Sequence, residues 1–546
     1  MMRQRTFCVP LEVKPESCAE LSTLISELRL KIDNAATAYQ LIAANVPSVH
    51  FMSMSVATHP DYDPIFILEA NIDGSPGVFW GQLEAAFGDN LRAMLRCCKR
   101  PLDHDGRLYD AVTERDSRSP VAPYFEARTQ RPSVFHHGNR GLERDRILAD
   151  KALFEAVRQE VDGAQGASPY RGLPVESARL KLREALLARF PWLSEPPPRR
   201  IGVVESNADI VRLLLFAAGV LLALSLPGLL LAPLLPARSY LLLVGAAALL
   251  ILPWLVMKRR GRPGTEVRTG FPWGIVRPKW LVLYVIAIVT YVAVATALLL
   301  PLVVAASQVL AWAGAAAPTT FAAAWRPLAL VIVLGLAALL VTIPLLLLRI
   351  RYLELNDSSR DAPHLDERTL RQMARREDWI AQNHMNSIVL IKPGSLRSLI
   401  IQAGHLGLGL VLRVTARSGY LGSLRTVHFA HWAFLNNRSR LLFLSNYDHS
   451  WDSYLDDFIE KAATGLTLSW GSGVGFPPAR FLFLDGAAHG RQFKNWALAS
   501  RSVSRFWYSA YRDLTVDQIE RNHRIANGLR AASLNERKAG AWMADL

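Results

Sequence analysis

The sequence predicts an α+β protein in which two copies of one soluble fold flank a block of four transmembrane helices. Two observations lead to this prediction. Short strings recur in the same order in both halves of the chain, and the stretch between the halves holds apolar runs long enough to cross a bilayer. At 546 residues the chain is too long for one ordinary domain, so we expect several.

Three pairs of segments make up the repeat. They are SVHF (48–51) with TVHF (426–429), ANIDGS (70–75) with SNYDHS (445–450), and FHHGNRGLERDRI (135–147) with WYSAYRDLTVDQI (507–519). The third pair aligns without a gap, so that Arg140 matches Arg512 and Leu142 matches Leu514. Three matches in one order indicate one fold used twice.

Hydrophobic periodicity predicts the same order of elements in each copy. In the first copy we expect strands at 6–14, 49–56, 65–72 and 133–137, and helices at 17–44, 77–97 and 142–161. In the second we expect strands at 386–392, 427–434, 441–447 and 505–511, and helices at 395–415, 451–467 and 516–529. The order is β-α-β-β-α-β plus a closing helix, which is the ferredoxin-like order. Two such sheets can bury their open faces against each other.

The predicted domain boundaries follow from these elements and from changes in composition. We place the first ferredoxin-like repeat at 1–165, a linker at 166–208, the transmembrane block at 209–352, a connector at 353–385 and the second repeat at 386–546.

Four apolar runs make up the transmembrane block, at about 213–235, 240–257, 280–300 and 328–348. None of them contains an Asp, Glu, Lys, Arg or His. Ionisable groups inside a membrane usually mark ion or proton paths, so their absence argues against a pump or coupled transporter. The block is more typical of an anchor, or of a platform for a small hydrophobic, lipid-like ligand.

Charge in the loops predicts the orientation. Seven basic residues against Glu266 alone lie between the second and third runs, and further Arg residues flank the first and fourth runs. By the positive-inside rule, both termini and this loop face the cytoplasm. We therefore expect an integral protein of a bacterial inner membrane, with the lipid bilayer as its partner and no signal peptide at its start. The oligomeric state stays open.

Two other features of the composition exclude function classes. The net charge of +15 could indicate nucleic-acid binding, but much of the excess flanks the apolar runs and no nucleic-acid motif accompanies it, so we expect no nucleic-acid partner. The four cysteines form no CxxC pair, which indicates reduced thiols in a cytosolic domain.

The segment 441–459 (LLFLSNYDHSWDSYLDDFI) and the paired element order resemble the dimeric α/β-barrel superfamily, whose tandem members include dye-decolourising haem peroxidases. The chain is also similar to a group of uncharacterised bacterial proteins with strings such as SNYDxSWxSYLDDF. The first resemblance implies an oxidoreductase that binds haem between the halves. The peroxidase GxxDG signature is missing, and the nearest string, LDGAA (484–488), belongs to another element.

Candidate ligand-binding residues recur in both copies. His50 and His428 stand at the start of equivalent strands, and a neutral imidazole can ligate haem iron. Asp73 and the pair Asn446 and Asp448 end the next strand, where each could line a pocket. The structural alternative is a histidine hydrogen-bonded inside a sheet, and acidic residues that end strands while Ser75 or Ser450 caps the following helix.

Further candidates lie in the second copy. His431 is on the opposite strand face from His428, Tyr508 aligns with His136, and Arg512 precedes the closing helix, where an anion could meet helix amides. The glycine-rich segment 471–491 contains His489 and Arg491 and is the best place for a function specific to one copy. The alternatives are a surface charge and an irregular connector.

Two functions remain open, and the sequence does not decide whether the protein is an enzyme. The first is a haem-binding or peroxidase-like oxidoreductase acting on a lipophilic substrate, an inference from fold analogy. The second is a non-catalytic, membrane-anchored ligand-binding or assembly module.

Overall fold

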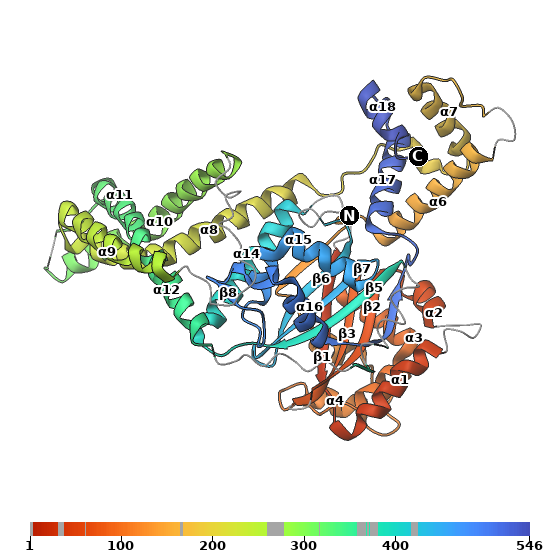
Figure 1. Cartoon of the computed structure of the whole chain (residues 1–546), viewed down its shortest axis with the longest axis horizontal. Coiled ribbons are helices and arrows are strands. Elements are labelled where there is room, and N and C mark those ends of the chain that lie inside the picture. The colour runs from red at the N-terminus through yellow and green to blue at the C-terminus, as the bar shows by residue number, and fades with distance from the viewer. Residues whose placement is uncertain are drawn as a thin grey trace. The chain divides into compact units, whose positions relative to one another are not determined.

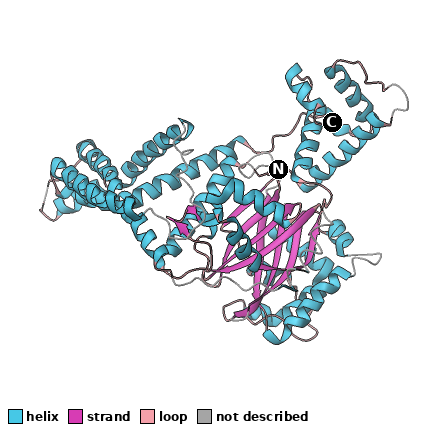
Figure 2. Ribbon diagram, viewed as in Figure 1, coloured by secondary structure: helices cyan, strands magenta, loops and turns pink. Residues whose placement is uncertain are grey.

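The structure is a computed structural model that describes residues 4–30, 38–59, 62–163, 168–258, 278–315, 317–357, 367–368, 371, 381–416 and 424–546. The chain divides into two compact units. The first contains Met1–Gly202, Ala362–Lys461 and Lys494–Leu546, and the second contains Val203–Asp361 and Ala462–Phe493. Helices and sheets are both present, as predicted (Figures 1 and 2).

Two sheets form the centre of the first unit (Figure 2). Their strands are β1 (Gln4–Glu12), β2 (Val49–His59), β3 (Tyr62–Asp73), β4 (Val134–His137), β5 (Gln382–Leu390), β6 (Val427–Leu435), β7 (Arg440–Asp448), β10 (Arg501–Ser502) and β11 (Ser504–Ser509). One sheet has the order β1-β3-β2-β11 and the other has the order β10-β5-β7-β6-β4. All the pairings are antiparallel.

Each half of the chain contributes a strand to the sheet of the other half. Strand β11, near the carboxy terminus, pairs with β2, so that Trp507 lies opposite Ser53. Strand β4, from the amino-terminal half, pairs with β6, so that Phe135 lies opposite His431. The order of elements along the chain does not reveal this exchange. It covers an edge of β2 and of β6, each of which would otherwise present unpaired backbone groups.

Helices of the amino-terminal half cover the outer face of the first sheet (Figure 1). They are α1 (Cys18–Leu30), α2 (Ala38–Asn45), α3 (Pro76–Arg96), α4 (Gly106–Thr113) and α5 (Ala122–Ala127). Phe7, Leu21, Phe79 and Trp80 belong to the hydrophobic core that they share with the sheet. Helices α1 and α2 both lie in the stretch predicted as a helix at 17–44, and residues 31–37 between them lie outside the described residues.

On the second sheet, the helix α14 (Ser395–Thr415) packs against β4. The buried His405 of α14 lies 2.9 Å from the Ser133 hydroxyl through Nδ1, and its ring contacts Phe434. Two more helices follow β7 in the chain. They are α15 (Trp451–Trp470), which has non-helical backbone angles at Ala462, and α16 (Gly490–Ala499). The segment predicted to be a glycine-rich loop contains the short strands β8 (Ala479–Arg480) and β9 (Leu484–Asp485).

The closing helices of the two halves pack against each other. They are α6 (Arg144–Asp162) and α17 (Val516–Arg530), with α7 (Val175–Leu187) and α18 (Glu536–Met543) beside them (Figure 1). Leu153 and Val157 of α6 and Ile525 and Leu529 of α17 are fully buried in one hydrophobic cluster, so each helix contributes an apolar face to the contact.

The second unit contains long apolar helices. They are α8 (Val203–Leu231), α9 (Ala237–Lys258), α10 (Pro278–Trp312), α11 (Phe321–Ala337) and α12 (Leu339–Leu355). The predicted runs at 240–257 and 280–300 lie within α9 and α10, the run at 213–235 continues past the end of α8, and the run at 328–348 spans α11 and α12. In the described part of the chain, five segments are long and apolar enough to cross a membrane. Four lie here, with α11 and α12 forming one of them, and the fifth is α14. These segments support a membrane protein.

Candidate functional site

A buried polar cluster lies where the two sheets of the first unit contact each other. Its centre is Glu69 of β3, whose carboxylate is fully buried. The Ser53 hydroxyl and the Asn71 side-chain amide both donate to this carboxylate at 3.0 Å. A charged residue within the otherwise apolar run 65–70 is costly to bury unless it is paired, so it needs partners from outside its own sheet.

The partners of Glu69 come from the second sheet. His384 of β5 lies 2.8 Å from one carboxylate oxygen through Nε2, and His431 of β6 lies 3.4 Å from the other through Nδ1. Burial alone would raise the pKa of Glu69, but the hydrogen bonds and charge of the two histidines hold that pKa well below its usual range. An ionised Glu69 therefore joins the two sheets.

Residues of β1 and β4 extend this cluster. The Thr6 hydroxyl donates to Asn71 Oδ1 at 2.8 Å and lies 3.0 Å from Nε2 of His137. Burial lowers the pKa of His137 well below its ordinary value of 6.5 and that of His136 to about 4. Both imidazoles are therefore neutral at pH 7 in the folded protein.

A histidine–aspartate pair stands at the end of the first sheet. Nε2 of His50 lies 2.9 Å from Oδ2 of Asp73, and its Nδ1 lies 2.9 Å from the Tyr511 hydroxyl. The same Oδ2 accepts the backbone N–H of Arg144, the first residue of α6, at 2.8 Å. Asp73 therefore fixes the start of a helix that is distant in sequence.

The second sheet has a matching pair. Nε2 of His428 lies 2.8 Å from Oδ1 of Asp448, and Oδ2 of Asp448 accepts the backbone N–H of Val516, the first residue of α17, at 2.8 Å. The gap-free alignment of 135–147 with 507–519 places Val516 opposite Arg144. Of the two serines expected to cap the following helix, Ser75 makes no capping hydrogen bond, whereas the Ser450 hydroxyl accepts the backbone N–H of Ser453 at 3.5 Å.

The structure shows which groups hold the two predicted haem ligands, His50 and His428. Both ring nitrogens of His50 are engaged, one by Asp73 and one by Tyr511. Nε2 of His428 is held by Asp448, and its fully buried ring packs against Phe51. Nδ1 of His428 is buried and forms no hydrogen bond with the residues that the structure describes. An axial ligand needs a free ring nitrogen beside the iron, so haem ligation by these histidines stays a prediction from the sequence.

The structure brings only some of the other candidates together. Nδ2 of Asn446 lies 3.4 Å from Glu69, so this residue and His431 belong to the buried cluster. Tyr508 lies instead in the hydrophobic core under the first sheet, and the exposed Arg512 lies over the Tyr39 ring at 3.6 Å. Neither residue takes part in the cluster.

The remaining candidates, His489 and Arg491, belong to the second unit and are not part of this cluster. Glu69 and His384, which the sequence analysis missed, complete it. The acidic residue inside an apolar strand was the signal that could have identified Glu69.

Among the described residues, one group of possible metal ligands lies in the first unit, with Asp103 and His104 exposed and Asp105 buried. The ligand atoms of Asp103, His104 and Asp105 lie within 4.8 Å of one another. Both carboxylates, however, pair with Arg128, at 2.6 and 3.2 Å. The group is therefore explained as a surface ion-pair network.

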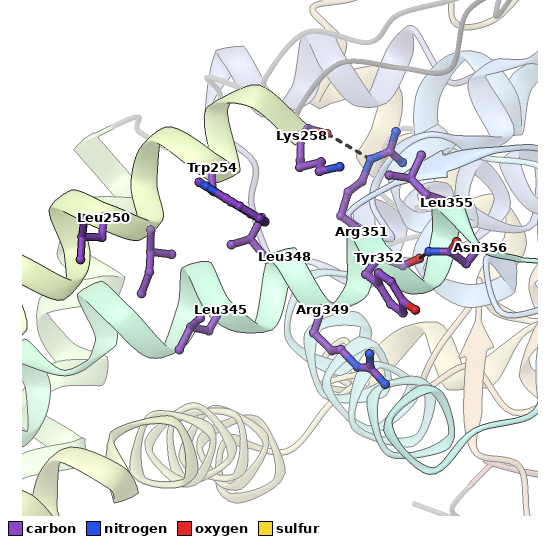
Figure 3. Close-up of a pocket in the computed structure, with 11 residues that line it drawn as sticks. Leu250, Trp254, Lys258, Leu345, Leu348, Arg349, Arg351, Tyr352, Leu355 and Asn356 are labelled. Atoms are coloured by element: carbon purple, nitrogen blue, oxygen red, sulfur yellow. Dashed lines mark hydrogen bonds between the residues drawn. The ribbon is translucent and has the colours of Figure 1, made fainter.

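A groove of about 790 Å³ lies between α9 and α12 of the second unit (Figure 3). Its wall is apolar at one end and basic at the other. The lining residues are Leu250, Ile251, Trp254, Lys258, Leu345, Leu348, Arg349, Arg351, Tyr352, Leu355 and Asn356. Its volume is in the range of ligand pockets.

Comparison of the chain with protein-family models, curated proteins and solved structures found no match. The resemblance to dimeric α/β barrels and to haem peroxidases therefore stays a prediction from the sequence.

Proposed function

We propose that this protein is a non-catalytic, membrane-anchored ligand-binding or assembly module. Its soluble part is a tandem ferredoxin-like pair, tethered by four membrane crossings with both termini in the cytoplasm of a bacterium. The observation that supports this most is how the reactive side chains are used. The Asp of each His–Asp pair holds a helix start, and Glu69 is paired with His384 and His431.

A catalytic acid, a catalytic base or a metal ligand must be able to contact a substrate or cofactor. The acidic and histidine side chains of the buried cluster are not accessible to one. The side chains of Glu69, His50 and His428 are fully buried, and Asp448 is 1% exposed. Their hydrogen bonds run to other protein groups, both within one sheet and between the two sheets. A buried network of hydrogen bonds and ion pairs of this kind rigidifies a scaffold.

The matched helix contacts support the tandem arrangement. Asp73 and Asp448 come from aligned strings, and the residues whose N–H groups they accept, Arg144 and Val516, are aligned as well. The exchange of β4 and β11 supports it too, because each closing strand then makes the same kind of pairing with the opposite half.

The packing of α14, the fifth apolar segment, supports four membrane crossings rather than five. The buried His405 and Ile401 place one face of α14 in the first unit. A helix that contacts a sheet in this way is better counted with the soluble module. An even number of crossings then leaves both halves on one side, where their strands can exchange.

The direct test of this proposal against the haem alternative is a visible spectrum. The protein is purified in detergent and its spectrum recorded with and without added haem. We expect no Soret band and no haem uptake. A Soret band that disappears in His428→Ala would overturn the non-catalytic proposal and support the oxidoreductase.

A further inference from the structure

The groove between α9 and α12 lies where these helices end. Helix α9 ends at Lys258 and α12 ends at Leu355. The two ends are joined by a hydrogen bond, in which Nε of Arg351 donates to the backbone oxygen of Lys258 at 3.2 Å. Figure 3 shows this contact at one edge of the groove. In a bilayer this is the level at which an apolar helix reaches the headgroups.

The apolar end of the groove offers a surface against which an acyl chain can pack. Leu250 and Leu345 are 75% and 48% exposed, and Leu348 faces Trp254 from the opposite helix (Figure 3). Trp254 is itself 59% exposed. A partly exposed tryptophan between an apolar and a charged region is typical of the membrane interface.

The other end of the groove, at the last turns of α9 and α12, is basic. Arg351 is already engaged, by Glu354 at 2.9 Å and by the Ala479 carbonyl at 3.1 Å. Lys258 and Arg349, by contrast, form no ion pair with any residue that the structure describes, and both are exposed. Arg349 lies over the Tyr352 ring at 5.2 Å. Helix dipoles favour cations at these positions, but they do not explain a groove between them.

We propose that this groove binds an anionic phospholipid. The headgroup lies over the last turns of α9 and α12, between Lys258 on one side and Arg349 with Tyr352 on the other. An acyl chain follows the apolar wall past Trp254 and Leu345. Basic pockets between transmembrane helices are known to suit anionic headgroups, and the volume suits part of one lipid. The site goes beyond the function proposed above and does not depend on it.

Native mass spectrometry of the full-length protein in detergent tests this site. Phosphatidylglycerol is titrated against the protein, and bound lipid is counted, with phosphatidylcholine as the zwitterionic comparison. We expect phosphatidylglycerol to bind preferentially. One basic residue near a headgroup accounts for about 5-fold in affinity, so Lys258→Gln and Arg349→Gln together should weaken binding by about 25-fold.

The matched control removes the same charge elsewhere. Arg238 and Arg326 are exposed basic residues near the amino-terminal ends of α9 and α11, and their double substitution by Gln should leave phosphatidylglycerol binding unchanged. Equal loss in both double variants, or equal binding of the two lipids, would overturn the proposal. So would soluble glycerol phosphate binding as tightly as the lipid, since the apolar wall would then have no role. An unchanged thermal midpoint confirms that each variant is folded.

Discussion

Asp73 and Asp448 hold equivalent positions in the two halves of the first unit. Oδ2 of each accepts the first backbone N–H of a closing helix at 2.8 Å, while each carboxylate also holds a histidine of the neighbouring strand. The negative charge lies at the positive end of the helix dipole, where it stabilises the helix start. One carboxylate therefore fixes a helix and a ring orientation together.

Removing that charge should destabilise the fold. For Asp448→Asn we expect a loss of about 2 kcal/mol in the free energy of unfolding, since the change weakens a buried cap and a charged hydrogen bond. Urea unfolding in detergent, followed by circular dichroism, measures it. Asp452→Asn is the control, because that side chain is 78% exposed and its loss should change stability by less than about 0.5 kcal/mol. Equal effects of the two changes would contradict the role given to Asp448.

Of the acidic residues between the two sheets, Glu69 should have the largest effect on the free energy of unfolding when it is replaced. Glu69→Gln leaves His384 and His431 without the charge that they face, and breaking a buried pair in this way costs about 3 kcal/mol or more. The same unfolding measurement applies, with the exposed Glu114→Gln as the control. A Glu69→Gln protein as stable as the wild type would mean that Glu69 does not join the sheets.

Stability should fall as the pH falls below 6.5. The depressed pKa values of His136 and His137 keep both imidazoles neutral in the folded protein, while the unfolded chain takes up protons below pH 6.5. Their contribution is complete above pH 6.5 and is lost as the pH falls towards 4. Glu69, with its low pKa, adds a contribution that is complete above pH 4.5 and is lost below it. Each unit of pKa difference is worth about 1.4 kcal/mol.

Urea unfolding at pH 7.5, 6, 5 and 4 measures this dependence. In His136→Asn the decline between pH 6.5 and 4 should be shallower than in the wild type, because one buried imidazole no longer titrates. An identical slope in the two proteins would remove His136 from this explanation.

The exchange of β4 predicts a steric effect at one glycine. Gly138 follows β4, and a Cβ there would lie 2.2 Å from the backbone oxygen of Val427 in the opposite half. Gly138→Ala should therefore destabilise the protein by more than about 2 kcal/mol. Gly81→Ala, in α3, has nothing within 4 Å of its Cβ and should be neutral or stabilising, which makes it the control. Thermal unfolding of both variants tests the β4–β6 contact.

Local patterns predicted much of this fold. The apolar runs predicted the helices of the second unit, and alternation predicted β2, β3, β6 and β7 to within a few residues, because the periods of 3.6 and 2 are local properties of the chain. Strand pairing depends on contacts between distant residues. The exchange of β4 and β11 was therefore not predictable from a single sequence.

Part of the candidate site was likewise predictable from the sequence, and part was not. His428 and Asp448 could be singled out because their strings recur, and His431 because it shares a strand with His428. The link between Glu69 and His384 spans 315 positions, so no local pattern connects the two residues. What each group does depends on its partners, and those are set by the sheet-to-sheet packing.

Labelling from the two sides of the membrane tests the central claim most directly. Cysteines placed at the exposed Glu114 and Ser453 report on the two halves, with the wild type giving the background from native cysteines. Right-side-out and inverted vesicles are treated with a membrane-impermeant maleimide. Sheets that exchange strands require both halves in one compartment, so both sites should react only in inverted vesicles. Reaction of the two sites from opposite sides would contradict the account.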